Sequence, residues 1–288
     1  MKKKAAAALL CALCLMPLPA LGAQLRLAVS CVPALLASLS AGAEHVSLFI
    51  MPQAGYMEDY ELAEADYLRA QSADVVVLIG GGLERFDSLL YAEGLKPAIA
   101  AGEDIARIPG RVLDPDEDDT PADNPYVWLS PSRWGQLVHG IASALAQIDP
   151  DNADRYTQAN LAAQQSVANV RQAMEAQLRL YAGREVIVMH PALSYLCADA
   201  GLKVVLTIER DPAAIPYAAD MEEIRTLIAA YPDAILVLEK DAPAAFEIIG
   251  GRKTALCDVL LRAPQIAGAD TWEGVMMENI RALARALE

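Results

Sequence analysis

The stretch "DNADRYTQANLAAQQSVANVRQAMEAQLRLY", residues 151–181, decides the fold. It contains no glycine or proline, the residues that interrupt helices, and Gly183 follows it. At 1.5 Å per residue, a helix of this length extends roughly 45 Å, more than the width of a small lobe. We therefore expect a linking spine helix over residues 151–182 that joins two lobes. Its apolar residues recur every three or four positions and form one stripe: Tyr156, Ala159, Ala163, Val167, Val170, Met174, Leu178 and Tyr181.

Apolar segments alternate with helical stretches on both sides of this helix. Runs such as VVVLI (75–79) and VIVM (186–189) are apolar throughout, as strands buried in parallel sheets are. The pattern predicts an α/β fold of two lobes with parallel β-sheets flanked by helices, residues 24–150 and 183–288. The expected strands are Leu25–Ser30, His45–Met51, Asp74–Ile79, Ile105–Val112, Glu185–Met189, Lys203–Ile208 and Ala234–Leu238. The expected helices besides the spine are Glu64–Gln71, Ser130–Gln147, Met221–Ala230 and Glu273–Leu287.

The first 23 residues have the composition of a signal peptide. Lys2–Lys4 form a positive start, Ala5–Met16 is an apolar run too short to span a bilayer, and Ala20–Ala23 offers a cleavage site. We expect a mature chain that begins near Gln24 and is periplasmic or secreted. A membrane anchor is the alternative.

The chain is strongly acidic. Leaving out the three leader lysines takes the 23 basic residues to 20 against 38 acidic ones, a net charge of about −18. Nucleic acid is therefore excluded as a partner, because binding it depends on cationic contacts to phosphate. A negative surface tolerates cationic ligands far better.

Three cysteines remain after the leader: Cys31, Cys197 and Cys257. In an exported protein this odd number leaves two possibilities open, a Cys197–Cys257 disulfide with one free thiol, or three buried thiols. Cys31 follows a segment similar to a lipid-attachment box, but Arg26 interrupts the apolar run before it.

His190, one of three histidines, stands where the VIVM strand ends and a helix led by Pro191 begins. Ligands of parallel α/β sheets collect beyond the carboxyl ends of the strands. The positive end of a helix dipole also disfavours imidazolium, and a neutral ring can coordinate a metal. From position alone, His190 is either a metal ligand or simply a hydrogen-bonded histidine.

Five segments in order along the chain carry a recognisable pattern: "YMEDYELAEADYLRAQSADVVVLIGGGLE" (56–84), "NPYVWLSP" (124–131), "MHPALSYLCADAGLKVV" (189–205), "LCDVLL" (256–261) and "TWEGVMMENIRALARAL" (271–287). They resemble the solute-binding receptors of zinc- and manganese-type ABC importers, a TroA-like family with a helical backbone. The second segment looks like that family's Asp-Pro-His-Val-Trp-Leu-Asp-Pro motif. The resemblance spans essentially the whole mature chain, and it rests on the order of the motifs.

The resemblance implies a partly substituted set of metal ligands. The family's third and fourth ligand positions are His190 and Asp258; the first falls on Glu58 and the second on Tyr126, a poor metal ligand unless deprotonated. Glu239, at the end of AILVLE, matches a family glutamate near the cleft. One imidazole with several carboxylates is a hard set that suits manganese or iron(II), although zinc outcompetes manganese in raw affinity.

The function implied by the resemblance is capture of a divalent transition metal (Zn, Mn or Fe) between the lobes, for delivery to an ABC permease. Such a receptor is a monomer that is not an enzyme and carries no organic cofactor; the metal is the transported ligand. The alternatives are a decayed metal site that binds a non-metal ligand or a metal chelate, a metal buffer without a permease, and a secreted metal-dependent hydrolase.

Other features have simpler interpretations. His45 and His139 match no ligand position. The Asp114–Asp119 run reads as a solvated loop, and the three glycines at 80–82 as a tight turn rather than a phosphate loop. Trp128 and Trp272 are expected to pack the lobe interface.

Overall fold

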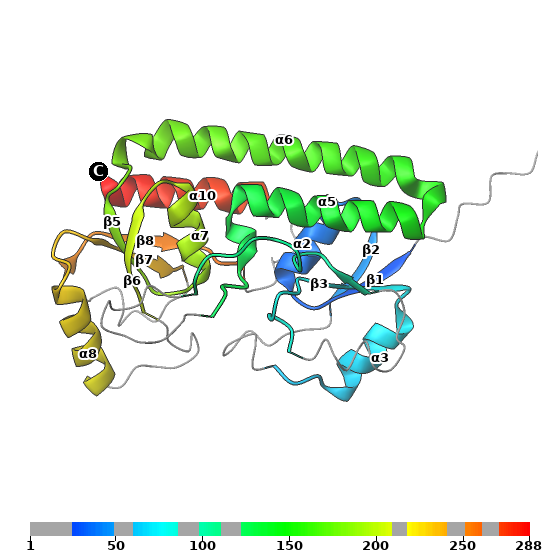
Figure 1. Cartoon of the computed structure of the whole chain (residues 1–288), viewed down its shortest axis with the longest axis horizontal. Coiled ribbons are helices and arrows are strands. Elements are labelled where there is room, and N and C mark those ends of the chain that lie inside the picture. The colour runs from blue at the N-terminus through cyan, green and yellow to red at the C-terminus, as the bar shows by residue number, and fades with distance from the viewer. Residues whose placement is uncertain are drawn as a thin grey trace, which may run out of the picture.

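Two parallel sheets lie side by side in the computed structural model, with helices around them (Figure 1). The structure describes residues 25–48, 60–85, 98–110, 122–208, 218–240, 251–260 and 271–288. The α/β prediction of two lobes joined by a long helix is confirmed. Among the helices in these ranges, none has the length and apolar character needed to cross a membrane.

The N-terminal lobe contains the parallel sheet β2-β1-β3-β4. Its central strands are apolar and buried, which explains why they read as uniform apolar runs in the sequence. The elements are β1 (Arg26–Val29), α2 (Val32–Ser40), β2 (His45–Leu48), α3 (Glu64–Ser72), β3 (Val75–Leu78) and β4 (Ala98–Ala100).

One predicted strand of this lobe is wrong. The prediction of a strand over Ile105–Val112 fails in its described part, because residues 105–110 form an irregular segment between two bends, with one isolated bridge from Pro109 to Asp123. Pro109 has no N–H to donate to a ladder, and Gly110 weakens any strand after it. The fourth strand is instead β4, which pairs with β3.

The C-terminal lobe repeats the same strand arrangement, with the parallel order β6-β5-β7-β8. Three of its strands were expected, and β8 was not. The elements are β5 (Glu185–Val188), α7 (Ala192–Asp199), β6 (Lys203–Thr207), α8 (Ala218–Ala229), β7 (Ile235–Glu239), β8 (Thr254–Cys257) and α10 (Trp272–Leu287).

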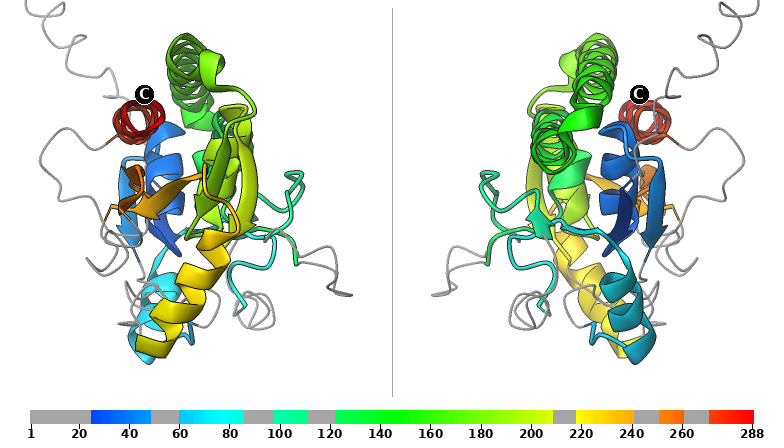
Figure 2. Two further views of the ribbon diagram at one scale, coloured as in Figure 1. Left: turned by 90° about the vertical axis from the view of Figure 1, so that its left-hand side faces the viewer. Right: turned by 90° about the vertical axis from the view of Figure 1, so that its right-hand side faces the viewer.

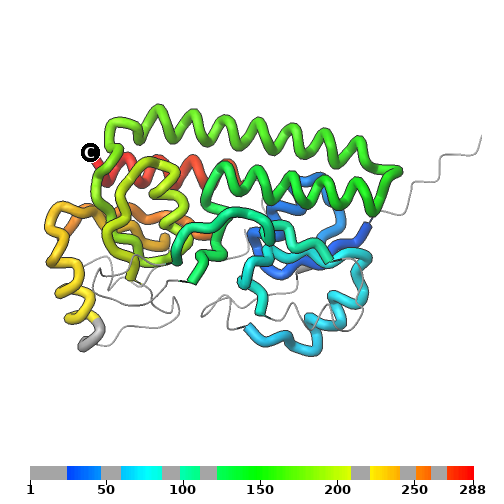
Figure 3. Tube along the Cα trace, viewed as in Figure 1, coloured from blue at the N-terminus to red at the C-terminus, as the bar shows by residue number. Residues whose placement is uncertain are grey.

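The spine helix α6 (Ala153–Leu178) runs over both lobes and packs against α5 (Pro131–Ile148) on one side and α10 on the other (Figures 1 and 3). Short 3-10 turns, Pro150–Asn152 and Arg179–Tyr181, extend it at both ends. Seen end-on, α6 lies at one edge of the molecule (Figure 2). Six residues of the predicted stripe are buried: Tyr156, Ala163, Val167, Val170, Met174 and Leu178.

The helix ends follow the expected local chemistry. Ser130 caps α5 by accepting a hydrogen bond from the Arg133 N–H, and Pro131 occupies the first helical position, where its missing N–H costs nothing. The lobes are joined beneath the spine by three tryptophans. The rings of Trp134 on α5 and Trp272 on α10 stack at 5.1 Å with 4° between their planes.

Trp128, in the 3-10 turn η3 (Val127–Leu129), is the third tryptophan between the lobes. The Trp272 indole N–H donates to the Trp128 carbonyl over 2.8 Å, and the Trp128 indole N–H donates to the Val259 carbonyl over 2.9 Å. All three rings are buried. The prediction that Trp128 and Trp272 pack the lobe interface is confirmed.

Candidate metal centre

The candidate centre lies at the carboxyl end of the C-terminal sheet, where its strand order reverses. The chain moves from β5 outward to β6 and then returns past β5 to β7, so β5 and β7 are the two neighbours at the switch point. Crevices at such points are where α/β sheets bind ligands. The β5–β7 register pairs Val188 with Val237, and two residues further along each chain stand His190 and Glu239.

The two side chains meet as the register implies. The His190 Nε2 lies 3.5 Å from the Glu239 Oε1. The other ring nitrogen, Nδ1, accepts a hydrogen bond of 3.0 Å from the Ala192 N–H at the start of α7. Because Nδ1 accepts, the proton of the neutral ring is on Nε2, facing the carboxylate.

Burial decides the charge of this ring. The His190 side chain is 2% exposed, and desolvation lowers the pKa of the imidazole to about 3. The ring is therefore neutral at physiological pH, which is the form that coordinates metals. The helix-junction argument predicted this neutrality, and desolvation is its main physical cause.

Tyr126 lies against this histidine from the segment that precedes η3. Its ring meets the His190 ring edge to face, with centroids 4.8 Å apart and 71° between the planes. It makes a second edge-to-face contact with Trp128 at 5.3 Å. Tyr126 is buried and brings an aromatic wall to His190.

Asp258 directly follows β8 and lines a pocket that does not include His190 or Glu239. Cys257 pairs with Glu239 in the β7–β8 register, and Asp258 is the next residue, so strand alternation turns it to the opposite side from Cys257. Its Oδ1 accepts a hydrogen bond of 2.8 Å from the Leu260 N–H, and it lines a pocket of about 360 Å³. That pocket is also lined by Lys240, Leu256, Glu278, Asn279, Arg281, Ala282 and Arg285.

Asn279 of α10 holds the backbone of this strand end. Its side chain accepts from the Asp258 N–H and donates to the Asp258 carbonyl, both over 2.8 Å. Within the ranges that the structure describes, no three or more His, Cys, Asp or Glu side chains gather into a metal-binding group. Glu58, the first-ligand candidate, lies outside these ranges, as do residues 1–24 and the Asp114–Asp119 run.

The other histidines lie at the surface and the cysteines in the interior. His45 and His139 are exposed, and the His139 Nδ1 lies 3.1 Å from the Asn160 side-chain amide of α6. Cys31, Cys197 and Cys257 are buried and free, so the structure has three buried thiols and no Cys197–Cys257 disulfide.

The glycines at 80–82 form the expected turn, all with positive φ. The Gly80 and Gly81 N–H groups donate to the carboxylates of Glu84 and Glu103.

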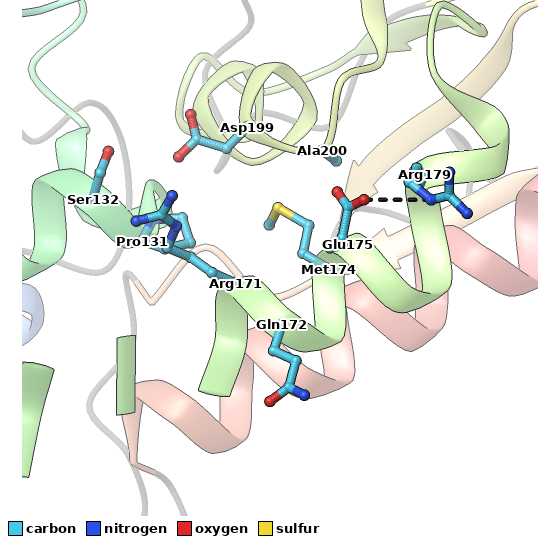
Figure 4. Close-up of a pocket in the computed structure, with 9 residues that line it drawn as sticks. All are labelled: Pro131, Ser132, Arg171, Gln172, Met174, Glu175, Arg179, Asp199 and Ala200. Carbon is cyan, nitrogen blue, oxygen red and sulfur yellow. Dashed lines mark ion pairs between the residues drawn. The ribbon is translucent and has the colours of Figure 1, made fainter. Parts of the chain in front are cut away.

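A larger hollow of about 560 Å³ lies elsewhere, where α5, α6 and α7 meet (Figure 4). It is bordered by the ion pair between Glu175 on α6 and Arg179 in the 3-10 turn that follows, and by Asp199 at the end of α7. Asp199 accepts a hydrogen bond from the Ser130 hydroxyl and pairs with Arg133 at 3.8 Å, so it ties the lobes together. The hollow is separate from the His190–Glu239 pair.

Comparison with known protein families identifies the family of this chain. Residues 40–286 match the family model described as zinc-uptake complex component A, periplasmic (ZnuA). The chain belongs to the ZnuA family. The match includes most of both lobes and the whole spine helix, and it begins after β1 and at the end of α2.

Individual members of the ZnuA family and its structural neighbours are similar at low identity. The high-affinity zinc uptake system protein ZnuA of Paracoccus denitrificans is 29% identical over 173 residues, 57% of this chain and 50% of that protein. The iron-binding protein YfeA of Yersinia pestis is 29% identical over 157 residues, 52% of this chain and 48% of that protein. The chain thus spans about half the length of these curated relatives.

Solved structures of the same shape support the fold. The Zn(II)-bound ZnuA-like domain of Streptococcus pneumoniae AdcA superposes with a TM-score of 0.75 at 23% identity, covering 92% of this chain and 99% of that one. FpvC of Pseudomonas aeruginosa, solved with Mn²⁺, gives a TM-score of 0.74 at 24% identity, covering 92% and 98%.

Proposed function

We propose that this protein is the extracytoplasmic receptor of an ABC importer and that it captures a divalent transition-metal cation for transport. The observation that carries the proposal is the His190–Glu239 pair. A buried, neutral imidazole faces a carboxylate at the switch point of a parallel sheet, with 3.5 Å between Nε2 and Oε1. Relatives named for zinc uptake and for iron binding support the same substrate class.

The proposed ligands come from both sides of the junction between the lobes. His190 and Glu239 form the core of the set, and Asp258, Glu58 and Tyr126 are its further proposed members. An imidazole combined with carboxylates accepts zinc, manganese or iron(II), and its hardness favours the latter two relative to a histidine-rich site. A cation can bind Nε2 only through the lone pair of that nitrogen, so capture would require the ring proton to move from Nε2 to Nδ1. That move keeps the ring neutral and breaks the hydrogen bond that Nδ1 accepts from the Ala192 N–H.

Receptor function also implies a location and a partner. We propose that residues 1–23 are removed on export and that residues 24–150 and 183–288 form the two lobes around the spine, residues 151–182. The receptor would act as a monomer that hands its metal to a permease, without catalysis and without nucleic acid. Mass measurement of the exported protein tests the cleavage, because a retained leader adds the mass of those 23 residues.

Elemental analysis and calorimetry test the cargo. Protein purified without chelators is expected to contain close to one equivalent of Zn, Mn or Fe. His190→Ala and Glu239→Gln are expected to lose most of that metal and to bind added Mn²⁺ or Zn²⁺ at least ten-fold more weakly. His139→Ala removes an exposed histidine from α5 and serves as the matched control.

Two results would overturn the proposal. Equal metal contents in wild type, His190→Ala and Glu239→Gln would remove both residues from the site. An organic adduct in native mass spectrometry, combined with absence of metal, would favour the alternative of a decayed site that binds a non-metal ligand. Asp258→Asn in the same series determines whether that carboxylate belongs to the set.

A further inference from the structure

Asn124 lies at the point where the N-terminal lobe meets the loop that carries His190. It is fully buried, and all of its polar groups are engaged. Its backbone N–H donates to the Ile108 carbonyl over 2.9 Å, and its carbonyl accepts from the Tyr195 hydroxyl over 2.6 Å. These two bonds fix the main chain of Asn124 between the lobes, since Tyr195 belongs to α7.

The side-chain amide of Asn124 makes two further contacts, and both lead to His190. Its Nδ2 donates to the Pro191 carbonyl over 2.8 Å, and Pro191 directly follows His190. Its Oδ1 accepts from the Tyr126 N–H over 3.1 Å. Tyr126 is the residue whose ring lies edge to face on the imidazole.

One amide group therefore holds the His190 ring from two directions. Through Pro191 it fixes the start of α7, where the Ala192 N–H holds the ring's Nδ1. Through the backbone of Tyr126 it places the aromatic ring of that residue against the imidazole. Only a group that both donates and accepts can make these two bonds, which an asparagine amide does and an ionised carboxylate does not.

We propose that Asn124 is a positioning residue for cation capture: it holds the His190 ring toward Glu239 without itself binding the metal. The inference rests on the proposed function for its substrate. Partners that orient metal-binding histidines through such contacts typically change metal affinity by 10- to 100-fold when they are removed. The family motif quoted above has aspartate and histidine where this chain has Asn124 and Tyr126, so both positions depart from that motif together.

The test compares Asn124→Ala with two controls. Tyr195→Phe removes the hydroxyl that anchors the Asn124 main chain but leaves the side-chain amide intact, so it measures general loosening of the same junction. Asn160→Ala removes an amide that contacts His139, on the spine and away from the site. Urea denaturation of each variant gives the stability change against which the other readouts are compared.

Two readouts separate this inference from the proposed function. The ring ¹H and ¹⁵N resonances of His190, assigned with His190→Ala among only three histidines, report the ring environment without added metal. Asn124→Ala is expected to shift or broaden them, and Tyr195→Phe of comparable stability is expected to shift them much less. Calorimetric titration with Mn²⁺ and Zn²⁺ is expected to show affinity 10- to 100-fold weaker for Asn124→Ala than for wild type.

Unchanged His190 resonances in Asn124→Ala would overturn the positioning role, whatever the metal affinities. So would losses of affinity in Asn124→Ala and Tyr195→Phe that simply follow their losses of stability. If wild type itself binds neither cation, the proposed function fails, while the resonance comparison still decides whether Asn124 sets the position of the ring.

Discussion

Acid should destabilise this protein through His190 in a way that one substitution isolates. The folded chain holds the pKa of this imidazole at about 3, whereas an unfolded chain has a histidine pKa near 6.5. Between these two values the unfolded chain binds a proton that the folded chain does not. Stability is therefore highest above about pH 6.5 and is lost as the pH falls toward 3.

The size of the effect follows from the same shift. Each pH unit below the unfolded pKa costs about 1.4 kcal/mol, so lowering the pH from 7.5 to 5.5 removes about 1.4 kcal/mol through His190 alone. The buried carboxyl of Glu84, whose pKa desolvation raises, acts in the opposite direction. It is present in wild type and variants alike, and it cancels when their pH dependences are subtracted.

Urea denaturation of chelator-treated protein at pH 7.5, 6.5 and 5.5 measures this directly. The free energy of unfolding of wild type is expected to fall by about 1.4 kcal/mol more than that of His190→Gln over this range. His139→Gln makes the same chemical change at an exposed position and serves as the control. Equal pH dependences in wild type and His190→Gln would refute the burial argument for a neutral imidazole.

Three further predictions concern the scaffold around the site. In urea denaturation, Gly81→Ala should lower the free energy of unfolding by at least about 1–3 kcal/mol, because φ is +66° there and the new Cβ would lie 1.5 Å from the Arg107 guanidinium. Gly82→Ala is the control and should cost less, because the space around its Cβ is open. Trp272→Phe should lower the free energy of unfolding by about 2 kcal/mol, measured by calorimetry, since the buried Trp128 carbonyl loses its hydrogen-bond donor. A variant as stable as wild type would show that this hydrogen bond between the lobes does not contribute to stability. Glu84→Gln should lower the melting temperature at pH 7.5, at a cost of about 1–3 kcal/mol. The two carboxylate oxygens of Glu84 accept from the Ile79 and Gly80 N–H groups, and the nitrogen of a glutamine amide cannot accept, so one of these N–H groups would lose its partner. An unchanged melting temperature would show that the carboxylate is dispensable.

Much of the fold follows from local patterns in the sequence. The apolar stripe of α6 and the uniform apolar runs of β3 and β5 predict a long helix between parallel sheets. A helix buried on one face repeats its apolar residues every three or four positions, and a strand buried on both faces is apolar throughout. β8 was missed since its four residues alternate in burial and are too few to show a pattern. Residues 105–110 include the apolar Ile105 and Ile108 that favour a strand, but Pro109 and Gly110 prevent a hydrogen-bonded ladder there.

The candidate site was predictable only in part. His190 and Glu239 each stand at the end of an apolar strand, and strand ends of a parallel sheet meet at one edge, so their proximity follows from topology. Asn124 gave no such signal, because its role depends on Pro191 and Tyr126, contacts that only the tertiary structure creates. Asp258 appears in the resemblance, but its direction depends on the register of a strand that the sequence did not reveal.

Two hydrogen bonds between the lobes end on the main chain of the C-terminal lobe, beside its candidate ligands. The Asn124 amide and the Trp128 indole donate to the carbonyls of Pro191 and Val259, each next to a candidate ligand. Every residue type has a carbonyl, so evolution or an engineer can exchange residues 190 and 258 for other donors without breaking these two hydrogen bonds. Under the proposed function, the preference for one cation could therefore change while the two lobes stay joined as they are.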